Sequence, residues 1–404
     1  MKPSIGIFTY SVKPRGSVVH AACLAEALQD EGANVTLYAL AKNGDEFYRS
    51  LRCPLVLLPA AAAKAGSAEL VQQRIAELQA GLATRAVHHD VYHAEDCLTA
   101  SALVTAVPAL SPVARTVHHV ERFQTPYLAE CQRRSIERSD LLFSVSERTA
   151  REVASEFGRS SQLVHNGVNL GRFEQTSAVL PPLASELGLR PDDVLVLSVG
   201  GVEERKNTLR ALEAMSGALA GDRRLFWVVA GGASIWDHSE LERHFDARVA
   251  SLPETVRRRI VRVGTVDEAT LTWLYRRSDL LLCPSLHEGW GLCALEALAA
   301  GTVVVASNRE PFTEFLDFGV ACLVEPTSTV SIQGAVLALA ADAPRRAKLG
   351  AAGRERAQRF SWRRAAVAHL EAYASLRPEA RPLSAPARAQ SARSVALSPE
   401  SHDA

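Results

Sequence analysis

The fold of this chain is decided by the stretch Pro284-Ser-Leu-His-Glu-Gly-Trp-Gly-Leu-Cys-Ala-Leu-Glu-Ala-Leu-Ala-Ala-Gly301. It follows a short apolar run, Leu280 to Cys283, that is typical of a buried parallel strand, and it leads into a helix rich in Ala and Leu. Gly289 and Gly291 allow the backbone to approach a ligand where that helix begins, and a helix N-terminus offers unpaired amides to a pyrophosphate. The order of strand, glycine-rich loop and helix predicts an α/β fold with an anion site at a strand end.

Two acids in this stretch need partners. Glu296 lies in a helical run that otherwise favours burial, so its carboxylate needs hydrogen-bond donors, and the vicinal hydroxyls of a ribose would supply them. Glu288 lies in the loop before the helix. The alternative is that Glu296 pairs with a neighbouring Arg and that Glu288 caps a turn, because structural ion pairs also place acids in such settings. The residues alone leave both interpretations open.

Composition limits the class of protein. The chain has 404 residues, 47% of them hydrophobic, with 45 basic and 45 acidic side chains, which favours two domains and gives no overall attraction to nucleic acid. Seven cysteines without Cys-x-x-Cys spacing argue against a disulfide framework or a zinc knuckle. No signal sequence and no apolar run of roughly 20 residues is present. We expect a cytoplasmic protein with no transmembrane segment and no nucleic-acid partner.

Short apolar strands alternate with helical stretches in both halves, which predicts parallel sheets. The expected strands of the first half are 5–10, 34–40, 55–58, 91–94, 113–117 and 141–145, and those of the second half are 194–199, 225–230, 260–263, 280–283, 303–307 and 321–324. Helices are expected over 18–31, 68–86, 344–359 and 361–376, among others.

The pattern breaks over residues 177–193, where we place the domain boundary. The prediction is a Rossmann-like domain over 1–176 and a second one over 177–360, both doubly wound, with their ligand site in the cleft where the strand ends face each other. Residues 377–404 are rich in Pro, Ala, Ser and Arg, and we expect them to be disordered.

The stretch from Pro284 to Gly301 resembles the Glu-x7-Glu signature of family 4 glycosyltransferases, with Trp290 where Phe is commoner. The resemblance implies a GT-B fold with a second domain that binds the donor, and a final helix, 361–376, that crosses back onto the first domain. It also implies retaining transfer of a hexose-type sugar from a nucleotide diphosphate sugar to an acceptor hydroxyl. In that family Glu296 would hold the ribose and Glu288 would orient the sugar. The donor would further contact Gly289, Trp290, Gly291 and Leu292.

The loop Gly200-Gly-Val-Glu-Glu-Arg-Lys-Asn207 places Arg205 and Lys206 just before a helix, where they could clamp phosphates. As residues alone they could equally be two solvated cations of a surface loop. The loop is similar to a family 4 variant in which these two cations contact the donor phosphates, and the commoner form carries Arg at the place of Gly201. The resemblance assigns Arg205 and Lys206 to stabilisation of the departing diphosphate.

Two positions of the first half extend the match. Thr116-Val-His118 resembles a family Thr-x-His-Asp in which the His reaches the donor sugar, although a lone His at a strand end can also be purely structural. His119 replaces the Asp and should point to the opposite face. Gly16 matches one of the paired glycines that the family places near the donor diphosphate, and Ser17 replaces the other.

Three further stretches, 90–96, 144–146 and 164–169, resemble the family in order and spacing, so that the resemblance covers residues 1–376. From residue physics we assign them structural roles first, with Ser146 as a helix N-cap and Asn166-Gly167 as a turn.

No Asp-x-Asp occurs, and no His, Cys or carboxylate cluster has metal-ligand spacing, so we expect no metal and no cofactor. A Gly-x-Ser-x-Gly elbow and a Walker loop are absent too. Alternatives are a non-catalytic protein that binds a sugar nucleotide, and a GT-B epimerase. A double displacement with Glu288 as the nucleophile competes with a same-face mechanism.

The acceptor is not identified by the sequence, and a saccharide, a lipid and a small molecule all stay open. The segment 121–138 carries several Arg residues beside apolar ones, so peripheral contact with an anionic membrane is one interpretation and a solvated helix face is the other.

Overall fold

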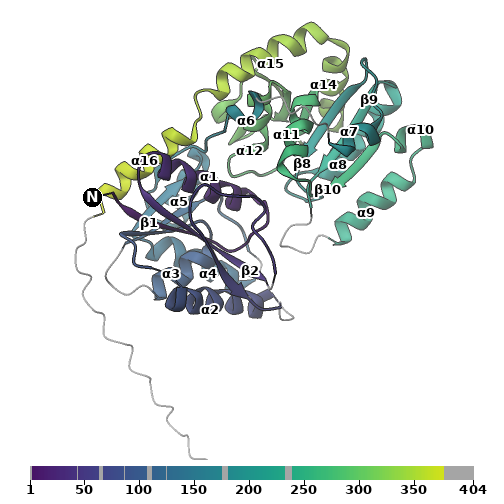
Figure 1. The fold of residues 1–404 in the computed structure, drawn as a ribbon. Helices are drawn as coiled ribbons and strands as arrows, with labels where there is room; N and C mark the ends of the chain where they lie inside the picture. The colour runs from purple at the N-terminus through teal and green to yellow at the C-terminus, as the bar shows by residue number, and fades with distance from the viewer. Residues whose placement is uncertain are drawn as a thin grey trace, which may run out of the picture.

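Two parallel sheets, each covered by helices, make up the computed structural model of this chain (Figure 1). The structure describes residues 2–42, 44–62, 67–85, 87–106, 112–123, 125–174, 181–232 and 239–376. In both sheets the strands are short, apolar and mostly buried, as expected where helices cover both faces. The architecture is the GT-B arrangement of two Rossmann-like domains that the resemblance implies.

The N-terminal sheet has seven strands in the order β3-β2-β1-β4-β5-β6-β7. Its strands are β1 (Ser4–Thr9), β2 (Asn34–Lys42), β3 (Leu55–Ala60), β4 (Val91–Ala94), β5 (Val113–Val117), β6 (Leu141–Ser144) and β7 (Gln162–Leu163). The helices between them are α1 (Gly16–Asp30), α2 (Ser67–Arg85), α3 (Cys97–Ala106), α4 (Pro126–Arg138) and α5 (Glu147–Phe157). The order reverses beside β1, and this is the place where doubly wound sheets bind ligands.

The C-terminal sheet has six strands in the order β10-β9-β8-β11-β12-β13. They are β8 (Val194–Val199), β9 (Leu225–Ala230), β10 (Ile260–Gly264), β11 (Leu280–Cys283), β12 (Val303–Ser307) and β13 (Ala321–Val324). The helices of this half are α6 (Gly171–Glu174), α7 (Pro182–Leu187), α8 (Thr208–Gly221), α9 (Ser239–Ala250), α10 (Glu254–Arg257), α11 (Glu268–Arg277), α12 (Leu292–Ala300), α13 (Phe312–Phe315), α14 (Thr329–Ala341) and α15 (Ala343–Ala357). The switch point of this sheet lies between β8 and β11.

The last described helix, α16 (Trp362–Ala374), lies against α1 of the N-terminal domain (Figure 1). Its Ala365, Ala366 and Tyr373 are buried in the core that α1 and β1 share. The chain therefore crosses between the domains twice.

The two crossing segments lie side by side. The amide of Val168 donates to the carbonyl of Phe360 at 3.1 Å. A Cβ atom placed on Gly167 would lie 2.1 Å from the amide nitrogen of Trp362, so a larger residue at this position would require the backbone to shift.

Helix α7 is a difference from the sequence prediction, which expected residues 177–193 to be a linker. Pro182 occupies the first turn, where its missing N–H costs nothing, and Leu183 and Leu187 are buried. Part of this segment is therefore a short helix packed on the core, because it buries these apolar side chains. Strand β7 was not predicted either. The expected disordered segment 377–404 and the domain boundary near residue 176 lie outside the described residues.

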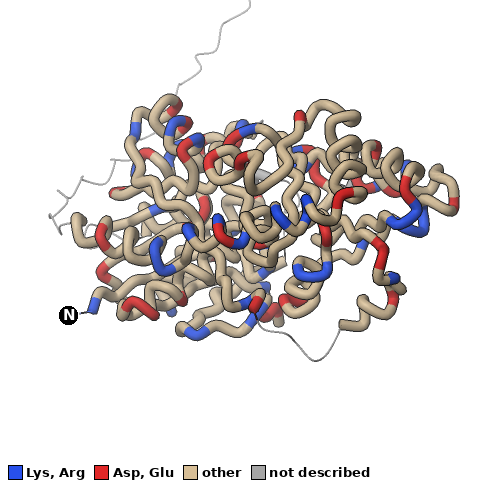
Figure 2. The backbone as a smooth tube through the Cα atoms, turned by 90° about the horizontal axis from the view of Figure 1, so that it is seen from above, with Lys and Arg blue, Asp and Glu red and all other residues tan. Residues whose placement is uncertain are grey.

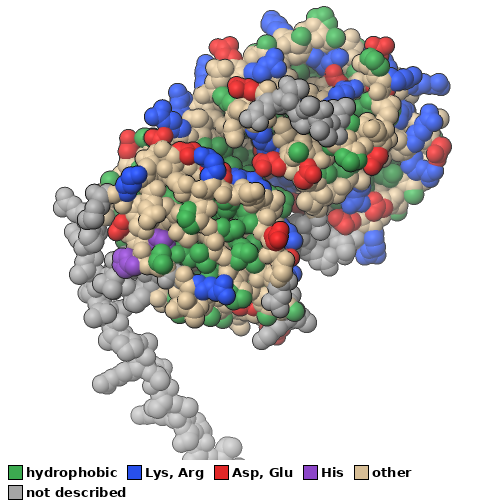
Figure 3. All heavy atoms as spheres, in the orientation of Figure 1, with side chains coloured by type: hydrophobic (Ala, Val, Ile, Leu, Met, Phe, Trp, Pro, Cys, Tyr) green, Lys and Arg blue, Asp and Glu red, His purple; other side chains and the backbone are tan. Residues whose placement is uncertain are grey.

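Charged residues of both signs are interspersed along the backbone (Figure 2), and their side chains are interspersed over the face seen in Figure 3. On α4, Arg133 pairs with Glu130 and Glu137, so part of the positive charge of this segment is neutralised. Among the described residues, no helix combines the length and the apolar character needed to cross a membrane. All seven cysteines are free thiols.

The two domains meet where the loop before α12 touches the end of β5. A Cβ atom on Gly289 would lie 2.1 Å from the carbonyl oxygen of His118. Nearby, the carboxylate of Glu314 accepts hydrogen bonds from the amides of Glu147 and Arg148, at 2.8 and 3.1 Å, and so caps α5 from the other domain. Only glycine permits the first of these contacts.

Substituting Gly289→Ala should therefore destabilise the domain contact, because the new Cβ atom and the carbonyl oxygen of His118 cannot both stay in place. We expect a loss of about 1–3 kcal/mol in the free energy of unfolding, in the range of overpacked sites, and a larger radius of gyration by small-angle scattering. Gly334→Ala is the matched control, because Gly334 lies inside α14 and nothing lies within 4 Å of its added Cβ. Equal stability and compactness of both variants would show that the domain contact does not depend on Gly289.

Candidate functional site

Two loops at the carboxyl ends of β8 and β11 form the centre of the candidate site. The amide of Leu286 donates to the carbonyl of Arg205 at 2.8 Å. Asn207, the N-cap residue of α8, is left-handed with φ 59°, and its Nδ2 donates to the carbonyls of Pro284 at 3.0 Å and Pro326 at 2.7 Å. Asn tolerates this conformation better than most residues. These hydrogen bonds hold the two loops together.

Glu288 lies between these loops and binds both cations predicted from the sequence. Its Oε1 accepts from Lys206 Nζ at 2.5 Å and from Ser285 Oγ at 2.9 Å, and its Oε2 accepts from Arg205 at 3.1 Å. Burial alone would raise the pKa of Glu288, but Lys206 and Arg205 outweigh it and hold that pKa at about 2. Glu288 is therefore a carboxylate throughout the neutral range.

The two cations differ in exposure. The side chain of Lys206 is 16% exposed, while that of Arg205 is 38% exposed and also pairs with Glu203 at 3.0 Å. Burial lowers the pKa of Lys206, but Glu288 and Cys293 together outweigh it and raise that pKa, so Lys206 keeps its charge. An anion that enters from the cleft would meet Arg205 first and Lys206 deeper in the site.

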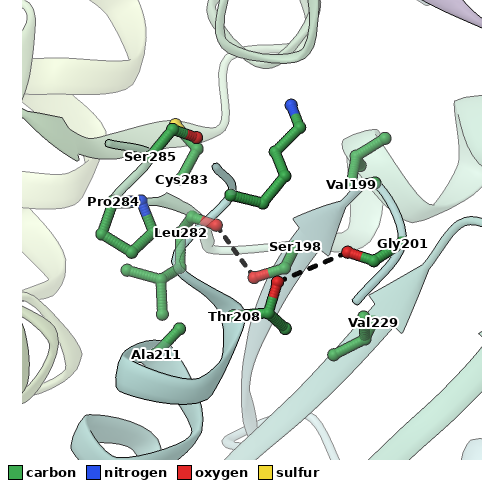
Figure 4. Close-up of a pocket in the computed structure, with 12 residues that line it drawn as sticks. Ser198, Val199, Gly201, Thr208, Ala211, Val229, Leu282, Cys283, Pro284 and Ser285 are labelled. Atoms are coloured by element: carbon green, nitrogen blue, oxygen red, sulfur yellow. Dashed lines mark hydrogen bonds between the residues drawn. The ribbon is translucent and has the colours of Figure 1, made fainter. Parts of the chain in front are cut away.

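A small pocket adjoins these residues at the ends of β8 and β11 (Figure 4). Ser198 Oγ donates to the carbonyl of Leu282 at 2.8 Å across it, and Lys206 is part of its wall. Gly201 also lines the pocket, and a Cβ there would lie 2.5 Å from the carbonyl oxygen of Gly232. This close approach explains why this chain has no room for the Arg of the commoner family form.

Glu296 has two partners that the sequence did not reveal. Its carboxylate accepts from Arg172 at 3.0 Å and from the hydroxyl of Tyr275 at 2.8 Å. Burial raises the pKa of Glu296, although Arg172 and Tyr275 oppose the rise. Glu296 thus pairs with an Arg, which is the alternative that the sequence left open. Arg172 comes from α6 and Tyr275 from α11, so no local spacing could have indicated them.

Of the residues around the start of α12, Gly291 forms the tight turn into the helix, whereas Trp290 and Leu292 pack toward the core. Gly291, at φ 102°, is the N-cap of α12, and a Cβ there would lie 2.6 Å from a ring carbon of Phe312. The side chain of Trp290 is buried and stacks on His165 and Phe315, with ring centroids 4.4 and 4.6 Å apart. The side chain of Trp290 thus packs in the core, so the predicted donor contact at this position would have to come from its backbone. Leu292 packs partly against the same core.

His118 brings the N-terminal domain into the site. It follows β5, and its Nε2 lies 2.9 Å from Oε2 of Glu95, while its backbone carbonyl faces Gly289. Burial lowers the pKa of His118 to about 4, although the hydrogen bond to Glu95 opposes this. His119 is exposed and pairs with Glu121 at 3.5 Å, so the neighbouring histidines face opposite sides as predicted.

Sequence reasoning missed the role of Glu95, which was assigned only a structural part. Its Oε2 also accepts from Nδ1 of His20 at 2.8 Å, and both side chains are buried. His20, Glu95 and His118 are the set of described side chains that could hold a metal ion, since their ligand atoms lie within 4.8 Å of one another. One nitrogen of His20 and one nitrogen of His118 contact the same oxygen of Glu95, which is the geometry of a hydrogen-bonded cluster.

Gly16 begins α1, and no protein atom lies within 4 Å of the place where its Cβ would be. Packing therefore does not require glycine here, and Arg15, the N-cap residue, makes no side-chain cap. The open space before this helix is compatible with the predicted approach of a ligand.

Two family models match the chain, in line with the two-domain geometry. The model described as glycosyl transferases group 1 matches residues 183–356, and the model described as Glycosyltransferase Family 4 matches residues 14–172. The first match contains both loops around Glu288, and the second contains Gly16, Glu95 and His118.

Curated relatives carry the name D-inositol 3-phosphate glycosyltransferase. The one from Saccharomonospora viridis is 35% identical over 215 residues, 52% of this chain and 49% of the relative. The one from Xylanimonas cellulosilytica is 31% identical over 282 residues, 65% of this chain and 66% of the relative. The chain thus spans about half to two thirds of the length of these relatives.

Solved structures share the fold at low identity. Sucrose-phosphate synthase from Thermosynechococcus elongatus superposes with a TM-score of 0.75 at 22% identity, covering 92% of this chain and 98% of that one. The Anabaena protein HepE in complex with UDP and glucose gives a TM-score of 0.74 at 18% identity, covering 93% and 100%. These likenesses show the GT-B fold, and the two matched models show that the chain belongs to the family 4 glycosyltransferases.

Proposed function

We propose that this chain transfers a hexose-type sugar from a nucleotide diphosphate sugar to an acceptor hydroxyl, with retention of the anomeric configuration and without a metal ion. The observation that carries the proposal is the buried carboxylate of Glu288, held by Lys206 and Arg205 in the loop before α12, with the backbone carbonyl of His118 against the adjacent Gly289 from the other domain. Fixed charges of this kind stabilise a leaving group without the cost of reorganisation.

The donor diphosphate is proposed to bind Arg205, Lys206 and the amides at the start of α12. Because both cations now contact carboxylates, a diphosphate would have to share or take over these hydrogen bonds. The nucleotide is proposed to place its ribose at Glu296, where the hydroxyls would compete with Arg172. HepE was solved in complexes with UDP and with UDP-glucose, which supports a uridine diphosphate sugar as the first donor to test.

In the proposed reaction the bond from C1 of the sugar to the diphosphate breaks, and a bond from C1 to the acceptor oxygen forms on the same face. The acceptor proton goes to an oxygen of the departing phosphate, whose growing charge Lys206 and Arg205 stabilise. Both oxygens of Glu288 already accept hydrogen bonds, and its pKa is low, so its carboxylate is a weak nucleophile. This favours an orienting role for Glu288 over a double displacement.

The acceptor is proposed to bind the N-terminal domain, near α1 and His118. The names of the curated relatives make a phosphorylated cyclitol the first acceptor to test, before saccharides and lipids. A cytoplasmic site of action is part of the same proposal.

A sugar-nucleotide sensor and an epimerase are the other candidates. A sensor would use Lys206 and Glu296 but would gain nothing from His118 in contact with Gly289. An epimerase needs an acid as well as a base, and Glu288, which is held in its ionised form, could serve only as the base. Both candidates are tested by the release of nucleotide diphosphate, which only a transferase couples to an acceptor.

Donor binding should be visible as thermal stabilisation. We expect one of UDP, GDP and ADP, or their sugar conjugates, to raise the melting temperature of the wild type in the absence of metal, and Glu296→Ala to lose most of this rise because the ribose loses its acceptor. Arg172→Ala is the matched control, since it also breaks the Arg172–Glu296 pair but keeps the carboxylate. Equal loss in both variants would mean that the pair, not the ribose contact, matters.

Lys206→Ala and Glu288→Ala should each lower kcat/KM by about 100-fold or more, the typical effect of removing one preorganised transition-state contact. Sugar transfer is measured by coupled detection of the released nucleotide diphosphate, after circular dichroism has shown that each variant is folded. Lys348→Ala, which changes an exposed lysine, is the control and should transfer normally. Near-normal turnover in a folded Lys206→Ala or Glu288→Ala variant would remove that residue from the mechanism.

Chelation should leave transfer unchanged. After dialysis against EDTA we expect the same kcat, because Lys206 and Arg205 supply the positive charge that a divalent ion supplies in other transferases. Activity that is lost with EDTA and restored by Mg²⁺ or Mn²⁺ would contradict the metal-independent mechanism.

A further inference from the structure

Glu95 lies at the centre of a buried cluster that the transfer mechanism does not use. It follows β4, its side chain is fully buried, and its Oε2 is 2.8 Å from His20 Nδ1 and 2.9 Å from His118 Nε2. We infer that Glu95 is a positioning residue, which holds His118 in one tautomer and thereby makes this histidine a hydrogen-bond acceptor toward the transferred sugar. This inference rests on the proposed function and deepens it.

The direction of the hydrogen bonds follows from the chemistry of the carboxylate. The three surrounding imidazoles, led by His20, lower the pKa of Glu95 against the effect of its burial, so it is ionised and can only accept. Each ring nitrogen in contact with Oε2 must therefore carry a proton. For His118 this fixes the proton on Nε2.

Other groups around the cluster do not compete for His118. His93 Nε2 lies 3.6 Å from the second oxygen of Glu95, but it hydrogen-bonds Oγ1 of Thr116 at 2.8 Å, and its Nδ1 bonds the hydroxyl of Tyr373. Glu95 Oε1 has no hydrogen-bond partner among the described residues. The ring of His20 packs edge-on against that of His118 with centroids 4.8 Å apart. Glu95 is thus the group that orients the His118 ring.

The other nitrogen of His118, Nδ1, is the atom that could accept a hydrogen bond from the sugar. Nδ1 makes no hydrogen bond to any of the described residues. It is also absent from the set of buried polar atoms that lack a partner, which means that this nitrogen is exposed to solvent. A neutral imidazole protonated on Nε2 presents a bare lone pair at Nδ1. Since the backbone of His118 touches Gly289, beside Glu288, this lone pair is available to a hydroxyl of the sugar.

The inference restricts which sugar the donor can carry. The sugar must carry a hydroxyl that donates to Nδ1, and a donor in which this hydroxyl is replaced by hydrogen or fluorine should lose the contact. Substrate selection at this position would then come from a carboxylate that never touches the substrate.

The test is the tautomer itself, read by ¹⁵N chemical shifts of histidine-labelled full-length protein, with the His118 signal assigned by its absence in His118→Ala. We expect protonated Nε2 in the wild type, a mixture of tautomers in Glu95→Ala, and recovery in Glu95→Gln, whose amide oxygen can still accept. A wild type protonated on Nδ1, or an unchanged tautomer in folded Glu95→Ala, would overturn the inference. This readout needs no donor, so it stands even if no transfer is found.

Kinetics provide the second arm. Glu95→Ala should lower kcat/KM roughly tenfold, the effect of losing one hydrogen bond, and should cause no further loss in a His118→Ala background. A similar loss in that background would mean that Glu95 acts only through the fold, which contradicts positioning. Zn²⁺ supplies a last check: if it raises the melting temperature of the wild type but not of Glu95→Ala, the three side chains are metal ligands and the inference fails.

Discussion

The burial of one carboxylate between two cations is the constraint on which the C-terminal half of the site depends. Glu288 takes hydrogen bonds from Lys206 and Arg205, which belong to the loop after β8, while its own loop follows β11. These strands are neighbours at the switch point of the sheet. Removing one member of a buried pair such as Lys206–Glu288 typically costs about 3–5 kcal/mol, because the other charge stays behind without compensation, whereas the more exposed Arg205 contributes less. The chemistry and the local stability of the site therefore share the same groups.

The fold followed closely from the sequence because its strands are buried on both faces. Continuous apolar runs such as Leu280 to Cys283 stand out against the helices, and their order along the chain fixed the expectation of two parallel sheets. Glu288, Lys206 and Arg205 lie in the loops after β11 and β8, where ligand sites are expected, but only the family resemblance assigned them to the site. Trp290 shows the limit: its position in the motif is adjacent to the site, but its size and apolar ring place it in the core.

What the sequence did not show are contacts between elements far apart in the chain. Arg172 and Tyr275 converge on Glu296 from separate helices, and only the packing of α6 and α11 brings them together. Glu95 could have been found in principle. It follows β4, His118 follows β5 and His20 lies on the helix after β1, and these strands are adjacent in the order β1-β4-β5. Carboxyl ends of adjacent parallel strands lie at one edge, so the strand order itself implies the cluster.

The position of His118 in the site has two separate determinants. Its ring is oriented inside the N-terminal domain, by the hydrogen bond to Glu95, whereas its distance from Glu288 is set by the contact of its carbonyl with Gly289. The ring orientation depends on where the imidazole proton lies, whereas the distance from Glu288 depends on van der Waals contact between backbones. Different substitutions should therefore alter the two. A substitution at position 289 should move the domains without altering the tautomer, and one at position 95 should alter the tautomer while the domains stay in contact. A site built from two domains can in this way keep the chemistry of a side chain constant while the distance across the cleft varies.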